Sequence, residues 1–258
     1  MKEPLKRRLQ RGEICTGTFL LFLAGADVAE FFAGLGLDFL FLDMEHGSFD
    51  LSRIRETIAV ASAHGTAPLV RVPEVQYHLV TRALDAGAEG IIAPRVETRR
   101  QCEDLVRFAR YGPDGERGIS TFAGHNRFRP LADVPGFIAD RNREILLVAQ
   151  IETRAGLENR DEILSVPGID ACLVGTGDLA MSMGHAGQVN HPAVRKAAEE
   201  VFQACRDRGL IFTVPLRAPE DVDCWQQMGL TMLALSSDGG MLLAGAKQFL
   251  SRVKRSGG

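Results

Sequence analysis

Two carboxylates that follow neighbouring apolar runs are the side chains of this chain best placed to do chemistry. Glu152 directly follows the apolar run 145–151, and Asp178 comes four residues after the apolar run 171–174. Two carboxylates with open positions suit a hard divalent cation such as Mg²⁺ or Mn²⁺, whose remaining ligands are water and substrate oxygens. The alternative is structural: one carboxylate would cap the next helix and the other would pair with an arginine such as Arg154.

A histidine and an arginine also stand at the ends of apolar runs. His46 follows Asp43 and Glu45, and a carboxylate beside a histidine fixes its tautomer and raises its basicity, which indicates a general base. Alternatively, His46 lies in a surface turn. Arg71 ends the next run and could hold a substrate carboxylate through two parallel hydrogen bonds. Alternatively, it forms a structural ion pair with Asp43, Glu45 or Asp85.

Lysine is absent from the ends of the apolar runs. The five lysines all lie in the N-terminal segment or on predicted helices, at positions 2, 6, 196, 247 and 254. A Schiff-base aldolase needs a lysine in its active site, so carbonyl chemistry here would use a metal ion as the Lewis acid. The segment Gly175-Thr176-Gly177 is not followed by the spacing of a dinucleotide or P-loop motif, so nucleotide binding has no support.

The elements that must position these residues alternate along the whole chain. Strands are predicted at 17–21, 39–43, 68–72, 90–94, 145–151, 171–174, 210–214 and 232–235, and helices at 26–36, 50–64, 75–87, 98–110, 154–165, 191–208, 219–229 and 240–254. Eight such units in 258 residues predict one α/β domain, a (β/α)8 TIM barrel spanning 1–258. The polar residues at the strand ends would then meet at the mouth of the barrel, where such enzymes carry their chemistry.

One segment, about 111–143, interrupts this alternation. It is too long for a plain connection between a helix and a strand, and long ordered loops are usually functional. It follows the fourth helix, so it should start at the N-terminal face of the barrel. A role in oligomerisation is equally compatible with this position.

Composition narrows the class of protein and its location. The net charge of −3 and the lack of a basic stripe argue against nucleic-acid binding. No apolar stretch approaches the roughly 20 residues of a membrane span, and the charged N-terminal segment is unlike a secretory signal. Five widely spaced cysteines, an odd number, suggest buried reduced thiols. We therefore expect a soluble cytoplasmic enzyme that acts on small molecules, without nucleic-acid or membrane partners.

With these residues in place, the sequence from about residue 12 to 250 resembles the HpcH/HpaI aldolases, metal-dependent (class II) aldolases of 2-keto acids. The most telling match is Asp43-Met44-Glu45-His46-Gly47 at the end of the second predicted strand. The ordered combination of short matches is highly specific; they lie at 39–47, 70–73, 84–92, 94–98, 110–118, 150–153 and 174–179.

The resemblance implies a role for each matching position. Glu152 and Asp178 would bind the divalent metal (Mg²⁺, Mn²⁺ or Co²⁺), and Arg71 would hold pyruvate and stabilise its enolate. His46, oriented by Asp43, would be the base, acting through a metal-bound water. The other expected site residues are Asp85, which would help to build the site across a subunit contact, Gln150 in the substrate site, and Gly175, Thr176 and Gly177, whose backbone N–H groups would receive the substrate carboxylate.

The resemblance also implies an assembly and a reaction. The family is typically a hexamer, a trimer of dimers in which the C-terminal helix is exchanged between neighbours. The expected activity is reversible cleavage of a 4-hydroxy-2-keto acid into pyruvate and an aldehyde. The regions expected to select the aldehyde, 119–128 and 214–217, depart from the family pattern, as does Gly-Thr-Gly-Asp at 175–178.

Three other functions stay open at this point. The same site could serve a citrate-synthase-like or decarboxylating enzyme of the family that uses oxaloacetate or a related 2-keto acid. A phosphate-binding barrel isomerase is a rival of another class, but it would not need the pair Glu152 and Asp178. A non-catalytic barrel is favoured least, because the carboxylate pair is present.

Overall fold

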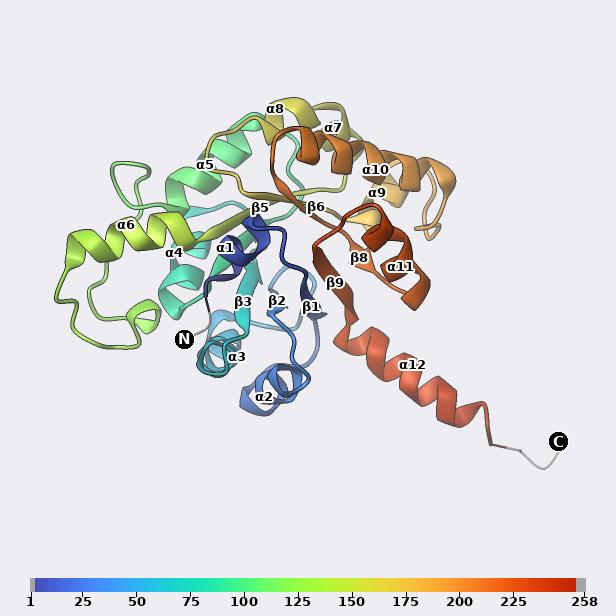
Figure 1. The fold of residues 1–258 in the computed structure, drawn as a ribbon, viewed down its shortest axis with the longest axis horizontal. Coiled ribbons are helices and arrows are strands. Elements are labelled where there is room, and N and C mark those ends of the chain that lie inside the picture. Colours follow the sequence, from blue (N-terminus) through green and yellow to red (C-terminus); the bar gives the residue numbers. More distant parts are fainter. Residues whose placement is uncertain (1–2, 254–258) are drawn as a thin grey trace.

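The predicted apolar runs form parallel strands in the computed structural model, which describes residues 3–253 (Figure 1). The sheet has the order β7-β6-β5-β4-β3-β2-β1-β9-β8, so that β1 to β7 pair in sequence order and β9 pairs with β1. The strands are β1 (Cys15–Leu20), β2 (Phe39–Asp43), β3 (Ala67–Arg71), β4 (Gly90–Ala93), β5 (Leu146–Ile151), β6 (Ala171–Val174), β7 (Ile211–Thr213), β8 (Pro215–Leu216) and β9 (Met232–Ser237).

The predicted seventh strand is divided into two short ones, so the barrel has nine strands where eight were expected. β7 pairs with β6, whereas β8 pairs with β9. Pro215 starts β8, and a proline has no N–H to continue a ladder of hydrogen bonds. Across this break, the hydroxyl of Thr213 donates a hydrogen bond of 2.8 Å to the Met232 carbonyl. The division therefore leaves the barrel nearly closed, as the sequence predicts.

Helices follow the strands, as expected, and among the described residues four further helices were not predicted. The additional ones are α1, the short 3-10 helix η1 and the helix α6 within the segment 111–143, and α9, which starts inside the Gly-Thr-Gly-Asp segment. The predicted helix at 154–165 is broken into two. The helices are α1 (Leu5–Gln10), α2 (Ala26–Gly34), α3 (Leu51–Ala63), α4 (Tyr77–Ala86), α5 (Arg99–Ala109), η1 (Gly124–Asn126), α6 (Val134–Glu144), α7 (Arg154–Glu158), α8 (Arg160–Leu164), α9 (Thr176–Ser182), α10 (Pro192–Asp207), α11 (Pro219–Gln227) and α12 (Asp238–Leu250).

Apolar side chains fill the interior of the barrel and the layer between strands and helices. Because successive side chains of a strand point to opposite faces, Phe39 and Phe41 enter the inner cluster while Leu40 and Leu42 enter the outer one. The rings of Phe19 and Phe41 pack with centroids 4.6 Å apart. The barrel is thus a filled core and not a pore, so polar side chains must gather at its ends.

Helix α1 closes the N-terminal end of the barrel. Its Leu5 and Leu9 belong to the inner cluster, where they pack below the strands. The opposite end, where the strands finish, is left for the polar residues singled out above.

Helix α12 extends away from the barrel, as Figure 1 shows at the C-terminal end of the chain. Only Asp238 of this helix is buried. Leu242, Phe249 and Leu250 are 61%, 79% and 61% exposed, so their apolar side chains lack cover within the described part of the chain. No helix among the described residues has the length and apolar character needed to cross a membrane. The expected exchange of α12 between subunits stays a prediction.

Candidate active site

A buried ion pair joins the ends of β2 and β3 at the mouth of the barrel. Asp43 and Arg71 occupy opposite positions in the register of these strands. The Asp43 side chain is fully buried and accepts a hydrogen bond of 2.9 Å from Nε of Arg71 and a second from its Nη2. Arg71 Nη1 lies 3.2 Å from Glu45 Oε2. The ion pair considered as an alternative for Arg71 is therefore present, and it fixes the plane of the guanidinium group.

The turn after β2 carries His46. Asp43 Oδ1 accepts hydrogen bonds from the backbone N–H groups of Glu45 and His46, at 2.9 and 3.3 Å. A Cβ atom on Gly47 would collide with the Asp43 carbonyl oxygen, so the turn requires glycine there. The His46 side chain is 54% exposed, and its Nε2 lies 3.7 Å from Glu45 Oε2. Asp43 thus holds the backbone of His46, while the carboxylate beside its imidazole belongs to Glu45.

Glu152, directly after β5, is 1% exposed and is held from two sides. Its Oε1 accepts a hydrogen bond of 2.8 Å from the backbone N–H of Arg95, and its Oε2 accepts one from the Gln150 amide. Arg95 has a φ of 48°, which is unfavourable for a residue with a side chain and is typically retained at functional sites. This backbone conformation accompanies the N–H contact that fixes Glu152.

The segment after β6 approaches Glu152 closely. A Cβ atom on Gly175 would lie 2.8 Å from Cβ of Glu152 and 3.2 Å from Nε2 of Gln150. Only glycine can therefore bring this segment against the two side chains. Thr176, Gly177 and Asp178 follow in the first turn of α9. The structure thus brings together all the residues predicted on the fifth and sixth strands.

Charge–charge interactions link the ionisable side chains at the mouth into one cluster. Burial raises the pKa of Glu152, and the nearby charge of Asp178 raises it further, against the opposing effects of Gln150, the Arg95 N–H and Arg71. Burial also raises the pKa of Glu45, which Arg71 opposes and Glu152 reinforces. Burial would lower the pKa of Arg71, but the hydrogen bond and charge of Asp43 outweigh it and raise that pKa.

The donor set fits a hard divalent cation. Glu152 and Asp178 supply carboxylate oxygens, which Mg²⁺ and Mn²⁺ prefer. Between residues 3 and 253 there is no group of three or more His, Cys, Asp or Glu side chains that could hold a metal. Water and substrate oxygens would complete a shell built on the two carboxylates. The buried Oε1 of Gln150 has no hydrogen-bond partner, which leaves one polar atom beside Glu152 free for a ligand.

The structural alternatives for the two carboxylates do not occur. The side chain that caps α7 belongs to Thr153, which accepts from the Gly156 N–H. The Arg154 guanidinium contacts the Met183 carbonyl at 3.5 Å, and no ion pair joins it to Glu152 or Asp178 in the part of the chain that the structure describes.

Asp85 lies apart from this cluster within the chain. It is near the C-terminal end of α4, and in a barrel of this kind that end faces the N-terminal ends of the strands. Its carboxylate pairs with Arg117 Nη2 at 2.7 Å and lies 3.3 Å from His125 Nδ1. Arg117 and His125 both come from the predicted insertion. The role expected for Asp85 across a subunit contact stays a prediction.

Sequence patterns did not predict two contacts that shape the mouth. One is the Arg95 N–H, because a positive φ at arginine leaves no trace in composition. The other is Asp238, whose Oδ2 accepts from the N–H groups of Leu21, Phe22 and Leu23 at 3.1, 2.8 and 2.8 Å. Asp238 thereby ties the loop after β1 to the start of α12.

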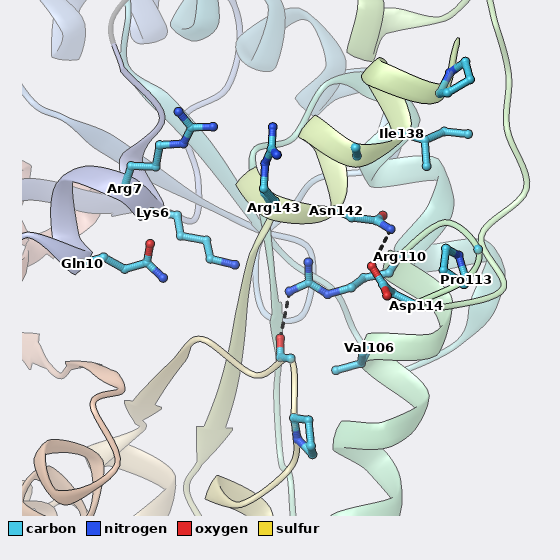
Figure 2. Close-up of a pocket in the computed structure, with 15 residues that line it drawn as sticks. Lys6, Arg7, Gln10, Val106, Arg110, Pro113, Asp114, Ile138, Asn142 and Arg143 are labelled. Carbon is cyan, nitrogen blue, oxygen red and sulfur yellow. Dashed lines mark hydrogen bonds between the residues drawn. The ribbon is translucent and has the colours of Figure 1, made fainter.

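A separate cavity lies at the other end of the barrel. It has a volume of about 1130 Å³ and is bounded by α1, α5, α6 and the loop before β6, with Lys6, Arg110 and Asn142 among its lining residues (Figure 2). Figure 2 shows the hydrogen bond from Asn142 to Asp114. Arg110 Nη2 donates a hydrogen bond of 3.1 Å to the Gly168 carbonyl. The cavity contains none of the predicted site residues.

A barrel with buried carboxylates and an oriented arginine at its mouth defines a class of enzyme rather than a binding scaffold. Residues 18–244 match the family model HpcH/HpaI aldolase/citrate lyase, and the chain belongs to this family. The recognition made from the sequence is thereby confirmed.

Individual relatives are similar over nearly the whole chain. The chain is 35% identical to a hydroxypyruvate/pyruvate aldolase of Roseovarius nubinhibens, over 96% of this chain and 95% of the relative. It is 32% identical to a 5-keto-4-deoxy-D-glucarate aldolase of Escherichia coli, over 85% of each. These relationships identify the chain as a carbon–carbon lyase.

Solved structures agree with this assignment. An HpcH/HpaI aldolase from Desulfitobacterium hafniense superposes with a TM-score of 0.93 at 32% identity, covering 98% of both chains. The citrate synthase SbnG superposes with a TM-score of 0.87 at 29% identity, covering 96% of both chains.

Proposed function

We propose that this enzyme is a divalent-metal-dependent aldolase that reversibly cleaves a 4-hydroxy-2-keto acid into pyruvate and an aldehyde. The proposal rests on the arrangement of charged side chains at the mouth of the barrel. There an arginine oriented by Asp43 lies in the same electrostatic cluster as the carboxylates Glu152 and Asp178. The names of the two aldolase relatives support pyruvate chemistry.

Arg71 would bind and stabilise the pyruvate part of the substrate. Cleavage of the C3–C4 bond leaves an electron pair that spreads onto the keto oxygen as an enolate. The guanidinium of Arg71 is held through Nε and Nη2 by Asp43, so its orientation is set before substrate arrives. A preorganised donor of this kind stabilises developing charge more than a mobile one does.

Glu152 and Asp178 would hold the cation. A divalent cation bound there would supply Lewis-acid stabilisation of the enolate charge. Gln150 and the Arg95 N–H fix the Glu152 carboxylate in place, and the backbone of residues 175–177 would receive the substrate carboxylate. His46, half exposed on the turn after β2, would accept the proton of the 4-hydroxyl group during cleavage.

Removal of metal tests the proposal. Pyruvate release from a 4-hydroxy-2-keto acid should cease after treatment with EDTA and return when Mg²⁺, Mn²⁺ or Co²⁺ is added in excess. The restored rates also rank the metals. Full activity in the chelator would exclude the metal-dependent reaction.

A second candidate function is supported by the similarity to the citrate synthase SbnG. An enzyme of that kind would use the same cluster to handle oxaloacetate or a related 2-keto acid, in condensation or decarboxylation. Parallel assays separate the two functions. Pyruvate released from hydroxy-keto acids supports the aldolase, whereas oxaloacetate consumption that depends on an acetyl donor supports the synthase.

The active enzyme is proposed to be a cytoplasmic homohexamer, a trimer of dimers that exchange α12. The apolar side chains of α12 are uncovered within the chain. Four of the five cysteines are buried, which suits a reducing compartment. Phe249→Glu should reduce the mass measured by light scattering, whereas Lys247→Glu on the same helix should not. An unchanged hexamer in Phe249→Glu would argue against exchange of α12.

A further inference from the structure

Arg217, directly after β8, forms no ion pair with an acidic side chain among the residues that the structure describes. Among residues 3–253, its only side-chain hydrogen bond is from Nη2 to the hydroxyl of Thr176, at 3.4 Å. The carboxylate of Asp221 accepts from the backbone N–H groups of Arg217 and Ala218, at 2.9 and 3.0 Å, so it fixes the backbone and not the guanidinium. The positive charge of Arg217 therefore remains available to a ligand.

A small pocket adjoins this guanidinium group. It has a volume of about 160 Å³ and lies between the segment after β6 and the segment after β8. Figure 1 shows α9, α10 and α11 gathered on this side of the barrel. Its wall includes Thr176, Asn190, Arg195, Arg217 and Trp225. Arg195 is held over the Trp225 ring at 4.3 Å and is bound through Nε to Glu199 at 2.6 Å.

The pocket borders the segment 175–178 of the proposed reaction site through Thr176. Thr176 lines it, and a Cβ atom on Gly177 would lie 3.6 Å from Arg217 Nη2. The same short segment continues into Asp178 and is preceded by Gly175, which packs against Glu152. A substrate held at the carboxylates could thus extend past Thr176 toward Arg217.

We propose that Arg217 is a specificity-determining residue that receives an anionic group of the acceptor aldehyde in this pocket. The inference rests on the proposed aldolase function and names its second substrate as an acidic aldehyde. A carboxylate is the expected group, because the planar guanidinium can bind it with two parallel hydrogen bonds. The volume would hold a carboxylate and a few carbon atoms, since one water occupies roughly 30 Å³.

The effect of removing this contact can be estimated. A hydrogen bond to a charged group contributes about 1.5–3 kcal/mol, which corresponds to roughly 10- to 150-fold in kcat/KM. The neutral aldehyde of similar shape does not make this contact. The loss should therefore appear as a change in the preference between acidic and neutral aldehydes.

The experiment compares Arg217→Met with the wild-type enzyme on two matched pairs of aldehydes, glyoxylate with glycolaldehyde and succinic semialdehyde with butanal. Condensation with pyruvate joins C3 of pyruvate to the aldehyde carbon. Arg217→Met should lower the ratio of kcat/KM for acidic over neutral aldehyde by about tenfold or more in at least one pair. Arg217→Lys, which keeps the charge, should recover part of that ratio. Arg154→Met removes an exposed arginine after β5 and should leave the ratio unchanged.

Hydrogen exchange at C3 of pyruvate, followed by NMR in D₂O, tests the donor half of the site without any aldehyde. One result would overturn the role of Arg217 but not the proposed function. In that result the wild-type enzyme exchanges these hydrogens, and Arg217→Met changes the ratio of kcat/KM for acidic over neutral aldehyde by less than about threefold in both pairs. A wild-type enzyme with neither exchange nor condensation would contradict the proposed function, and the inference with it.

Discussion

Buried charged groups are paired more completely at the N-terminal end of the barrel than at its mouth. At the N-terminal end, Lys6 lies 2.6 Å from Asp170, and Arg8 lies 2.9 Å from Asp38. The same aspartates also accept backbone N–H groups, those of Leu147 at 3.0 Å and Thr16 at 2.9 Å. These carboxylates are thus bound both by a cation and by the backbone, an arrangement that stabilises the closed end of the barrel.

At the mouth, the polar groups are less completely satisfied. Burial raises the pKa of both Glu45 and Glu152, Gln150 Oε1 has no partner, and Arg95 keeps a strained φ of 48°. Such features destabilise a folded protein and are retained where a ligand completes them. The comparison predicts that substitutions at the mouth reduce activity, whereas substitutions at the N-terminal end reduce stability.

Arg71→Lys should have the largest effect on the mouth. Lysine keeps the charge beside Asp43, which limits the loss of stability, but it cannot reproduce the two-point contact of the guanidinium. We expect kcat/KM for pyruvate formation to fall by about 10²–10³-fold, the range for loss of one preorganised donor. A coupled assay of pyruvate release measures this. Arg154→Lys is the matched control, and comparable rates for the two variants would remove Arg71 from the mechanism.

Asp170→Asn makes the opposite test at the N-terminal end. Lys6, Arg110 and Asp170 have side chains that are 8%, 9% and 10% exposed, so the substitution leaves two buried cations without their carboxylate. Breaking a buried ion pair costs about 3–5 kcal/mol, and we expect the free energy of unfolding in urea to fall by about 3 kcal/mol. The specific activity of the folded fraction at 25 °C should be unchanged.

A matched control for this substitution is Asp140→Asn. Asp140 pairs with Arg143 on α6, and their side chains are 53% and 64% exposed. An exposed pair contributes less than about 1 kcal/mol, so this variant should unfold like the wild-type enzyme. Equal losses of stability in the two variants, or a loss of activity in folded Asp170→Asn, would contradict the assigned role of the N-terminal end.

Gly175→Ala tests how closely the segment after β6 must approach Glu152. The added Cβ would lie 2.8 Å from Cβ of Glu152, closer than packed atoms allow, so the segment must shift. Misplacement of a catalytic group by about 1 Å can lower the rate about 10²-fold. We expect a smaller shift of this segment to lower the rate by about tenfold. The metal concentration needed for half-maximal activity should also increase. Gly34→Ala, at a helical position in α2 with open space around it, controls for loss of glycine. Normal metal dependence in Gly175→Ala would show that this approach is not required.

Local apolar patterns predicted the barrel and most of its mouth. Parallel strands are buried on both faces, so runs such as 39–42 and 145–149 are continuous enough to be recognised. The side chains that end or closely follow each run must then lie near the mouth, and the charges of Arg71 and Asp178 do act on Glu152 in the structure. Whether a residue lies at the end of a strand can thus be predicted from the sequence around it.

Features that depend on contacts distant in sequence were not predictable in this way. Helix α1 is only six residues long and forms where Leu5 and Leu9 cover the barrel interior. Helix α9 starts in a segment containing glycine, and its position depends on the approach of Gly175 to Glu152. The imidazole of His46 lies beside Glu45 because the Asp43 carboxylate is already bound by Arg71. The spacing of these residues in the sequence does not predict which of the two carboxylates Arg71 binds most closely.

Asp85→Asn gives the smallest expected effect and concerns a residue outside both groups of charged side chains compared above. Burial would raise the pKa of Asp85, but His125 and Arg117 outweigh it and leave that pKa below its usual value. The ionised carboxylate therefore stabilises the fold above the unfolded pKa of about 3.9, and this contribution disappears as the pH falls through the lower folded value. With the side chain 34% exposed, we expect a loss of about 1 kcal/mol at pH 7, and the difference from the wild-type enzyme should shrink below about pH 4.

The activity of Asp85→Asn decides whether the carboxylate also serves a neighbouring active site. If it does, kcat should fall in a protein that remains folded and assembled at pH 7, as judged by circular dichroism and light scattering. Asp104→Asn on α5, which removes a carboxylate that pairs with Arg107, is the matched control for loss of a charge in an ion pair. Equal activity of the two variants would limit Asp85 to anchoring the segment that carries Arg117 and His125, and the mouth would then be complete within one chain.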